Sequence, residues 1–337
     1  MGDGKTLGIA FLGCGYAATI HAKRLRSFPN VRMYFASRER AKAEAFARKY
    51  GGAGAFWADA GNAYGGYGAA LQDARVDVAL VLTPPSSHLH LTLAALAQGK
   101  HVVVEKPPFE RASDFEIVRK EKERVGRRVM IAENYFYKPL AEALRETIAS
   151  GALGEPRIVT VNALKEQRVK DWRGDPALSG GGALYEGGIH WVDFFANLGM
   201  EVTGVQAFRP GGDDGSPDRS MVVGFTYANG AVGTLYYSWE MPVLLKGVHL
   251  SAVYGTEGVA SFESNGIFLM VRGRKRSLRS KLADVAGYAG MWKDFVPALI
   301  ENREPRFDFD KAKRDLVLTE AAYASLGRDL SVPGLNP

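Results

Sequence analysis

Residues 7–18, LGIAFLGCGYAA, place a short apolar run directly before a glycine-rich turn. The apolar run predicts a buried strand, and the residues after the turn predict a helix that reaches about Ser27. Gly13, Gly15 and Ala18 fill the spacing Gly-x-Gly-x-x-Gly/Ala. In this pattern the first glycine permits a tight turn, and the second lets the backbone approach a pyrophosphate at the helix N-terminus. The stretch therefore predicts the first βα unit of a dinucleotide-binding domain.

Strand and helix signals alternate after this unit. The second strand is Val31–Ala36, and later strands end near Leu82, Val104 and Ala132. The glycine- and tyrosine-rich stretch Gly51–Gly68 is expected to be an irregular surface loop. Helical patterns separate the strands at Ala41–Tyr50, His90–Gln98 and Ser113–Val125. Regular alternation of this kind predicts a doubly wound parallel sheet.

The end of the second strand bears on the choice of cofactor. A site selective for NAD places Asp or Glu here to hold the ribose hydroxyls, whereas this chain has Ser37 followed by Arg38. A hydroxyl and a guanidinium together can bind the 2′-phosphate of NADP. We therefore expect NADP(H) to be favoured, and Glu39 keeps NAD(H) open as the alternative. The competing interpretation leaves Arg38 in solvent or stacked on the adenine.

Two further strand ends carry candidate site residues. A β-branched run ends in Glu105 and Lys106, and the two prolines that follow stop the strand. The proline-rich turn Thr83–His88 follows another strand, and ligands of an open parallel sheet bind at this carboxyl edge. His88 and His90 have His-x-His spacing, but no third ligand follows nearby in the sequence. We therefore predict no metal site.

The second half of the chain has a different pattern, short strands separated by glycine or asparagine turns. The turn Ala228-Asn229-Gly230 is typical of a hairpin, and successive hairpins predict a mostly antiparallel open sheet. The basic run Arg272–Lys281 is expected to be a solvated loop, with binding of a phosphorylated ligand as the alternative. The expected strands are Arg157–Leu164, Val202–Phe208, Met221–Tyr227, Ala231–Ser238, His249–Tyr254, Gly258–Glu263 and Gly266–Val271, followed by helices at Tyr288–Glu301 and Asp310–Gly327.

These patterns predict an α/β protein of two domains. Residues 1–133 form a Rossmann dinucleotide-binding domain, and residues 134–337 form an α+β domain for substrate binding and oligomerisation, whose last helices are free to pack back on the first domain. The antiparallel sheet has too few helices after it to cover both faces. We therefore expect a subunit interface, a homodimer or homotetramer, on hydrophobic positions such as Val222, Phe225, Leu235 and Tyr237.

The run GGGALYEGGIHWVD at residues 180–193 is the second candidate for chemistry. A helix from Leu184 would place Glu186, His190, Asp193 and Asn197 in one polar stripe. An imidazole beside carboxylates suits proton transfer near neutral pH. The two glycines inside the helix weaken it, which indicates that backbone or ligand approaches closely there. The alternative, without a catalytic role, is a surface amphipathic helix with a hydrogen-bonded histidine.

Composition limits the class of protein. The chain has 337 residues, 46% of them hydrophobic, a net charge of +6 and a single cysteine. One cysteine excludes an internal disulfide and fits a reducing cytoplasm. The mild positive charge suits an anionic cofactor and is far from a nucleic-acid signature. No apolar run is long enough to span a membrane, and the N-terminus does not have the pattern of a signal peptide.

These motifs together resemble the glucose-fructose oxidoreductase/inositol dehydrogenase/MocA (Gfo/Idh/MocA) family of nicotinamide-dependent oxidoreductases. The matching pieces are the glycine-rich turn with His21, Glu105-Lys106-Pro107, Glu133-Asn134-Tyr135 and the run around Glu186, His190 and Asp193. The resemblance covers nearly the whole chain. It implies a Rossmann domain and a C-terminal domain with an open antiparallel sheet that mediates subunit contacts in many members.

The resemblance also implies the site residues. The catalytic set would be Lys106, His190 and Glu186. The family usually has Asp at the position of Glu186, so Glu186 could have a different role from that Asp. We expect the substrate to contact Lys106, Tyr135, Trp172, Glu186 and His190. We expect the cofactor to be bound by Gly13, Gly15, Tyr16, Ala17, Ser37, Arg38, Thr83, Pro84, His88, Glu105, Lys106 and Asn134.

The function that follows is hydride transfer between NAD(P) and a hydroxyl or ketone of a sugar-like or cyclic polyol substrate, or of a sugar nucleotide. Two alternatives stay open from the sequence. One is an NAD-dependent glycoside hydrolase of the same family, which returns its cofactor in each cycle. The other is a cofactor-binding regulator without catalysis, which the presence of Lys106, Glu186 and His190 together argues against.

Overall fold

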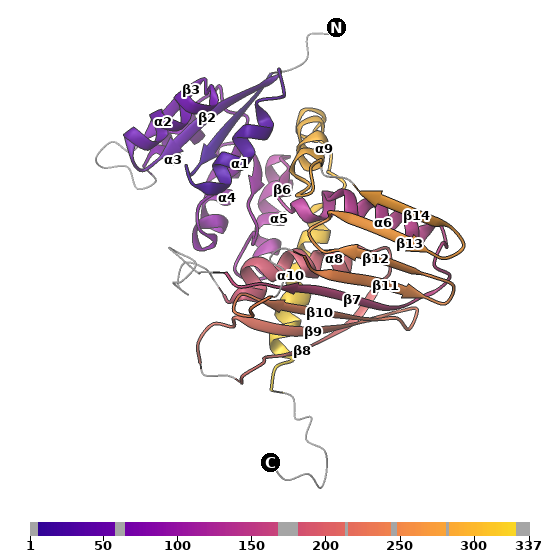
Figure 1. Cartoon of the computed structure of the whole chain (residues 1–337). Coiled ribbons are helices and arrows are strands. Elements are labelled where there is room, and N and C mark those ends of the chain that lie inside the picture. Colours follow the sequence, from indigo (N-terminus) through magenta and orange to yellow (C-terminus); the bar gives the residue numbers. More distant parts are fainter. Residues whose placement is uncertain are drawn as a thin grey trace. The chain divides into compact units, whose positions relative to one another are not determined.

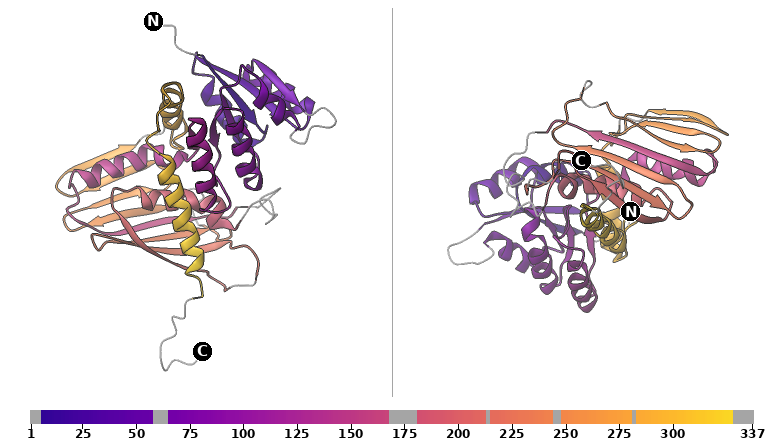
Figure 2. Two further views of the ribbon diagram at one scale, coloured as in Figure 1. Left: turned by 180° about the vertical axis from the view of Figure 1, so that it is seen from behind. Right: turned by 90° about the horizontal axis from the view of Figure 1, so that it is seen from below.

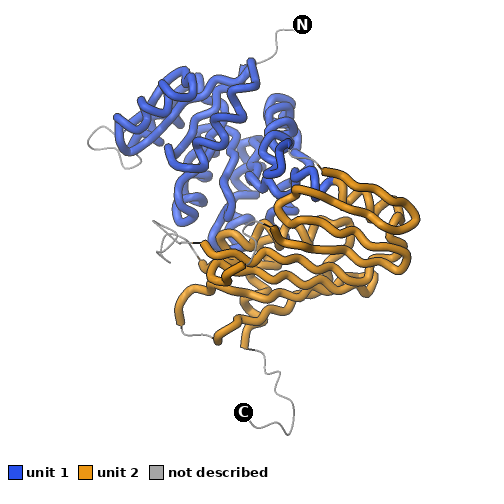
Figure 3. Tube along the Cα trace, in the orientation of Figure 1, with its two compact units in different colours: residues 1–142, 169–180, 282–314 blue, residues 143–168, 181–281, 315–337 orange. Residues whose placement is uncertain are grey.

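The computed structural model describes residues 6–57, 65–167, 181–212, 215–243, 248–280 and 283–327. The chain divides into two compact units, each containing one sheet (Figures 1 and 3). Unit 1 comprises residues 1–142, 169–180 and 282–314, and unit 2 comprises residues 143–168, 181–281 and 315–337. No helix in these described ranges is long and apolar enough to cross a membrane.

The sheet of unit 1 confirms the predicted doubly wound parallel architecture. Its six strands have the order β3-β2-β1-β4-β5-β6, and every neighbouring pair is parallel. Strand β1 is buried at all six positions, which explains its unbroken apolar sequence. The strand order reverses at β1, so the carboxyl ends of β1 and β4 form the switch point where such sheets bind ligands. The strands are β1 (Leu7–Leu12), β2 (Val31–Ser37), β3 (Gly54–Trp57), β4 (Val78–Val81), β5 (His101–Val104) and β6 (Val129–Ile131).

Helices and short turns connect these strands close to the predicted positions. One expectation is wrong in part, since Gly51–Gly68 contains β3 and the start of helix α3. A strand of only four residues between glycines gives no periodic signal. Gly66 lets α3 pack against β3, because a Cβ atom there would lie 2.5 Å from the Cα of Trp57. The connecting elements are α1 (Tyr16–Leu25), α2 (Arg40–Tyr50), α3 (Gly66–Gln72), η1 (Pro85–Ser87), α4 (His88–Ala97), α5 (Asp114–Val125) and η2 (Asn134–Tyr137).

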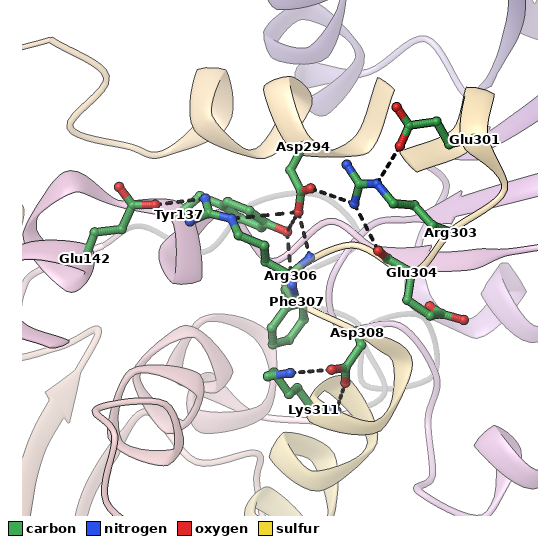
Figure 4. A network of polar contacts seen from close by, with 10 residues as sticks. All are labelled: Tyr137, Glu142, Asp294, Glu301, Arg303, Glu304, Arg306, Phe307, Asp308 and Lys311. Carbon is green, nitrogen blue, oxygen red and sulfur yellow. Dashed lines mark hydrogen bonds and ion pairs between the residues drawn. The ribbon is translucent and has the colours of Figure 1, made fainter. Parts of the chain in front are cut away.

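A polar network fixes the last segment of unit 1 to the η2 turn (Figure 4). Helix α9 (Tyr288–Glu301) contributes Asp294, which accepts hydrogen bonds from Tyr137 Oη at 2.8 Å and from the backbone N–H of Arg306 at 2.7 Å. Tyr137 Oη in turn accepts from the N–H of Phe307 at 3.1 Å. The Arg306 guanidinium reaches Glu142 on helix α6 (Pro139–Ala149) at 2.8 Å. The network thus holds a segment distant in sequence against the turn that follows β6.

The sheet of unit 2 has eight strands in the order β14-β13-β12-β11-β7-β10-β9-β8. All pairs are antiparallel except β7 with β10, which confirms the predicted mostly antiparallel sheet. Gly230 has φ +79° between β9 and β10, as the predicted hairpin turn requires. The strands are β7 (Pro156–Leu164), β8 (Val202–Phe208), β9 (Ser220–Tyr227), β10 (Val232–Ser238), β11 (Leu250–Gly255), β12 (Val259–Glu263), β13 (Phe268–Arg272) and β14 (Arg276–Ser280).

The basic run at residues 272–281 is not the solvated loop that we expected. Its central part is β14, an edge strand that pairs with β13 and is exposed at every position. Arg274 pairs with Glu257, and Arg279 pairs with Glu146 at 3.0 Å. Charged side chains are tolerated on such a strand because they stay in water, and they discourage pairing with other strand edges.

One face of the unit 2 sheet is covered by helices of the same chain. The 180° view in Figure 2 shows α6 and α10 (Phe309–Ala324) over this face. The expectation that Phe225, Leu235 and Tyr237 form a subunit interface is wrong, because all three are at most 2% exposed. The ring of Phe225 stacks on Phe195 at 4.4 Å between centroids. Period-2 alternation identified these strands, but it does not say which of the two faces the helices cover.

The opposite face of this sheet carries the exposed apolar side chains. Val222 lies on this side, opposite Tyr236 in the β9–β10 register. Ile158 and Val232 lie opposite each other in the β7–β10 register and are 51% and 47% exposed. The other exposed apolar side chains on strands of this sheet include Tyr236, Leu250, Tyr254, Met270 and Leu278.

Candidate functional site

The glycine-rich turn after β1 has the two glycines in different roles. Gly13 has φ +118°, and a Cβ atom there would lie 3.1 Å from the carbonyl oxygen of Leu82. Gly15 begins α1 with an ordinary φ of −106°, and a Cβ atom there would meet nothing within 4 Å. The N-cap residue of α1 is Gly15, which has no side chain to cap the helix, so the first N–H groups are available to an anion. Tyr16 follows and is 78% exposed, and Ala17 lies in the same first turn.

The β2 end presents the residues expected to discriminate between cofactors. Ser37 is buried, and its Oγ accepts a hydrogen bond from the backbone N–H of Glu39 at 3.1 Å. Arg38 is exposed at this end of the strand. Burial raises the pKa of Tyr67, and the positive charge of nearby Arg38 acts against that rise. A hydroxyl, a guanidinium and a phenol therefore lie at this end of the sheet.

The turn after β4 is held together by its own side chains. Ser87 Oγ lies 2.6 Å from Thr83 Oγ1 and 2.9 Å from the carbonyl oxygen of Pro84, both within hydrogen-bonding distance of its single proton. His88 is 1% exposed, with Nε2 lying 2.7 Å from the Thr83 carbonyl and Nδ1 2.9 Å from the Pro107 carbonyl. Burial lowers the pKa of His88, and its hydrogen bonds to the two carbonyl oxygens act against that fall. His88 thus joins two loops at the ligand edge of the sheet.

Lys106 lies two residues beyond the end of β5, at the strand end where the sequence placed it. Its peptide bond to Pro107 is cis. Its backbone N–H donates to Oε2 of Glu105 at 3.0 Å, and Oε1 of the same carboxylate lies 2.8 Å from Nε2 of His21. The His21 ring is completely buried, and Trp292 of α9 donates its indole N–H to His21 Nδ1 at 3.0 Å. The backbone that carries Lys106 is therefore fixed by buried groups from α1 and α9.

The η2 turn contains two further predicted site residues. The Glu133 side chain caps the turn by accepting from the N–H of Tyr135 at 2.9 Å. Asn134 is buried, and its side-chain amide donates to the carbonyl of Ala286. Lys138 places its amine 4.0 Å from the centre of the Tyr135 ring. Trp172, the other predicted substrate contact, lies outside the described residues.

The run around Glu186 folds differently from the single helix that we expected. Leu184–Gly188 forms a π-helical turn, η4, and the α-helix α8 covers only Ile189–Ala196. The π turn changes the rotation per residue, so the spacing of Glu186 from the residues of α8 differs from that of one regular α-helix. Asp193 and Asn197 are buried and hydrogen-bond to each other, Nδ2 to Oδ1, at 2.7 Å. This leaves Glu186 on the π turn and His190 in the first turn of α8 as the candidates for chemistry.

The two glycines of this run are explained by a close approach of the sheet. A Cβ atom at Gly187 would lie 2.3 Å from Tyr237 Oη, and one at Gly188 would lie 3.3 Å from the same ring. Tyr237 is itself held by the indole N–H of Trp239, which donates to its hydroxyl at 2.8 Å. The η4 turn therefore packs directly on β10, as the weakened helix signal indicated.

Two residues that the sequence did not single out hold the start of this turn. Asp218 is buried, and its Oδ2 accepts from the backbone N–H of Leu184 at 2.9 Å. Tyr323 of α10 donates to Asp218 Oδ1 at 2.6 Å and accepts from the N–H of Tyr185 at 3.1 Å. Burial raises the pKa of Asp218. No local pattern connects Asp218 with Tyr323, which lies 105 residues further along the chain.

Two protein-family models match this chain. Residues 7–133 match the oxidoreductase family with an NAD-binding Rossmann fold, and residues 141–261 match the GFO/IDH/MocA C-terminal domain. The chain belongs to the Gfo/Idh/MocA family. This confirms the resemblance carried by its motifs.

Curated relatives of this Gfo/Idh/MocA chain have dehydrogenase names. D-glucoside 3-dehydrogenase of Escherichia coli (strain K12) is 30% identical over 191 residues, which cover 56% of this chain and 52% of the relative. Trans-1,2-dihydrobenzene-1,2-diol dehydrogenase of Sus scrofa is 29% identical over 231 residues, which cover 67% of this chain and 64% of the relative. The chain therefore spans between half and two thirds of the length of these curated relatives.

Solved structures share the fold over most of their length. A levoglucosan dehydrogenase in complex with NADH has a TM-score of 0.82 at 19% identity, covering 95% of this chain and 97% of that one. An aldose-aldose oxidoreductase from Caulobacter crescentus in complex with glycerol has a TM-score of 0.82 at 22% identity, with the same coverage. These likenesses establish the fold of the Gfo/Idh/MocA chain.

The motif residues of the Gfo/Idh/MocA family are distributed over both units. Unit 1 brings together the glycine-rich turn, the η1 turn and Lys106 with Glu105 at the ligand edge of its sheet. Unit 2 holds Glu186 and His190 on η4 and α8. Within the part of the chain that the structure describes, no group of three or more His, Cys, Asp or Glu is placed to hold a metal ion.

Proposed function

We propose that this protein is a nicotinamide-dependent oxidoreductase that transfers a hydride between NAD(P) and a hydroxyl or ketone of a sugar-like or cyclic polyol substrate, including sugar nucleotides. The observation that carries the proposal is the arrangement at the end of β5. There Lys106 follows a buried carboxylate that is hydrogen-bonded to both its backbone and His21. The names of the relatives, glucoside and dihydrodiol dehydrogenases, support an alcohol or ketone substrate.

The residues of unit 1 fit a dinucleotide. Gly15 leaves the space of a side chain empty at the uncapped start of α1, where a pyrophosphate would be held. Gly13, Tyr16 and Ala17 would border the same anion, and Thr83, Pro84 and His88 would border the far side of the switch point. The nicotinamide supplies or accepts the hydride when bound. The chain's own task is to orient the substrate and to move one proton.

We assign the proton transfer to His190. In the direction of oxidation its imidazole accepts the proton of the substrate hydroxyl, and in reduction it returns that proton. Lys106 donates a hydrogen bond to the same oxygen and stabilises the negative charge that develops on it. Glu186 orients His190 or balances the charge of Lys106, with one more methylene than the family's usual Asp. Tyr135 and Trp172 are proposed to border the substrate.

NADP(H) is the cofactor that we propose to be favoured. Ser37 and Arg38 provide a hydroxyl and a guanidinium for a 2′-phosphate, and the position that would hold an NAD ribose carboxylate is Ser37. Glu39 begins α2 beside them and keeps NAD(H) open. Related structures are described both with NADH and as NADPH-dependent.

We further propose a homodimer or homotetramer formed through the exposed face of the unit 2 sheet. Side chains such as Ile158, Val232 and Tyr236 place apolar groups side by side on adjacent strands. A contiguous apolar face of this kind is characteristic of an interface. We propose that residues 1–133 bind the cofactor and that residues 134–337 bind the substrate and mediate assembly. The single buried thiol, Cys14, suits a reducing cytoplasm as the location.

The test is turnover with a panel of sugars, cyclic polyols and sugar nucleotides, each offered with NADP⁺ and with NAD⁺. The proposal predicts net formation of reduced nicotinamide with at least one of them. A family hydrolase would cleave a glycoside without net reduction of the cofactor. Tight cofactor binding with no reaction in either direction across the panel would instead favour a regulator.

A further inference from the structure

His21 is a buried histidine with a fixed partner on each ring nitrogen. Trp292 Nε1 lies 3.0 Å from His21 Nδ1, and Glu105 Oε1 lies 2.8 Å from His21 Nε2. The imidazole and the indole are fully buried, and Glu105 is 8% exposed. The three residues come from α9, α1 and the end of β5, all within unit 1.

The partners assign the position of the imidazole proton. An indole N–H can only donate a hydrogen bond, so His21 Nδ1 must be the acceptor and carries no proton. The remaining proton is on Nε2, which donates to the Glu105 carboxylate. The hydrogen bonds therefore run in one direction, from Trp292 through His21 to Glu105.

The second carboxylate oxygen of Glu105 links this chain of hydrogen bonds to the backbone of Lys106. Oε2 accepts the backbone N–H of Lys106 at 3.0 Å, so both carboxylate oxygens act as acceptors. Tyr288 contacts the edge of the His21 ring at 5.4 Å between centroids. Burial raises the pKa of Tyr288, and the charges of Glu105 and Glu133 raise it further, so its hydroxyl stays neutral.

We propose that Trp292, His21 and Glu105 form a hydrogen-bonded relay of fixed direction that positions Lys106 to donate its hydrogen bond to the substrate oxygen. His21 and Trp292 are then positioning residues, which touch neither substrate nor cofactor. The proposal rests on the role of Lys106 proposed above. His21 belongs to α1, so the imidazole links this helix to the turn of Lys106 through Glu105.

The first test reads the tautomer without any reaction. Long-range ¹H–¹⁵N spectra of the protein with ¹⁵N-labelled histidine distinguish a protonated from an unprotonated ring nitrogen, and His21→Gln identifies the His21 signals. We expect unprotonated Nδ1 and protonated Nε2 in the wild type at neutral pH. A protonated Nδ1, or protons on both nitrogens, would overturn the relay.

The second test uses Trp292→Phe, which removes the indole N–H and keeps an aromatic ring. We expect kcat to fall about tenfold or more, since small displacements of a catalytic group are costly, while the Kd for cofactor changes less than about twofold. His21→Gln keeps an N–H donor toward Glu105 and should retain several times more turnover than His21→Leu. His101→Gln is the matched control, because His101 is a buried histidine at the opposite end of β5.

A double-variant comparison separates this proposal from the proposed function. If the relay acts through Lys106, Trp292→Phe lowers turnover in the wild type and lowers it no further in a Lys106→Ala background. Equal losses in both backgrounds, or losses that follow the melting temperature as in His101→Gln, would refute positioning. Normal turnover in Lys106→Ala alone would show that Lys106 does not have the role given to it in the proposed function. The ¹⁵N spectrum of His21 then still decides whether the hydrogen-bonded relay exists.

Discussion

A substitution at Gly15 separates an effect on cofactor affinity from an effect on the stability of the fold. The substitution Gly15→Ala adds a Cβ atom that meets no atom of the chain within 4 Å, at a φ of −106° that alanine adopts without strain. We therefore expect the free energy of unfolding of the cofactor-free protein to change by no more than about 0.5–1 kcal/mol, with a small gain from the stiffer unfolded chain. The methyl group would occupy the space assigned to the pyrophosphate. Affinity for NADPH and NADH should then fall at least about tenfold, equivalent to about 1.4 kcal/mol.

Gly13→Ala is the matched comparison. At Gly13 the backbone has φ +118°, and the new Cβ would lie 3.1 Å from the Leu82 carbonyl oxygen. Strain of this kind costs roughly 1–3 kcal/mol in the protein itself. Thermal unfolding without cofactor and fluorescence titration with each nicotinamide measure the two quantities separately. Unchanged cofactor affinity in Gly15→Ala, or a loss of stability as large as that of Gly13→Ala, would refute the assignment of the pyrophosphate to this turn.

Three further substitutions test other parts of the structure. Ser37→Asp should lower NADPH affinity at least about tenfold and shift preference to NADH, because a carboxylate repels a 2′-phosphate; fluorescence titration that shows an unchanged ratio would contradict it. Gly187→Ala should destabilise the protein by about 1–3 kcal/mol, because its Cβ would overlap Tyr237 Oη. Denaturant unfolding measures this, with Gly224→Ala as the control, since a Cβ atom there would meet the Gln206 carbonyl oxygen at an ordinary 3.7 Å. Tyr236→Lys should lower the molar mass measured by light scattering, because it places a charge in the proposed interface. A wild-type protein that is already monomeric at micromolar concentration would exclude the proposed assembly.

The sequence predicted the elements that carry strong local patterns. The glycine-rich turn, the strand before Lys106 and the Ala228–Gly230 hairpin all combine periodicity with residues that only a turn requires, and all were confirmed. The short strand β3 and the edge strand β14 were not predicted, since four residues have no period and a row of charges is typical of a loop. Their strand conformation comes from pairing with a neighbour.

Long-range contacts account for what the sequence could not show at the site. The π turn at 184–188 depends on Asp218 and Tyr323, and these residues carry no signal of a shared role. His21 belonged to a recognised motif, but its partner Trp292 lies 271 residues away. Phe225 and Leu235 show the same limit, because alternation predicts two faces and only the packed helices decide which is buried.

The most direct measurement of the central claim is single-turnover hydride transfer, followed by stopped-flow, in Lys106→Ala and His190→Ala with the substrate that the panel identifies. A group that acts in acid–base catalysis contributes about 10²–10⁴-fold to the rate. We therefore predict a loss of at least about a hundredfold in each variant, with cofactor affinity largely retained. A near-normal rate of hydride transfer in one variant would show that this residue does not have the proposed role. Near-normal rates in both variants would contradict the assignment of the active site.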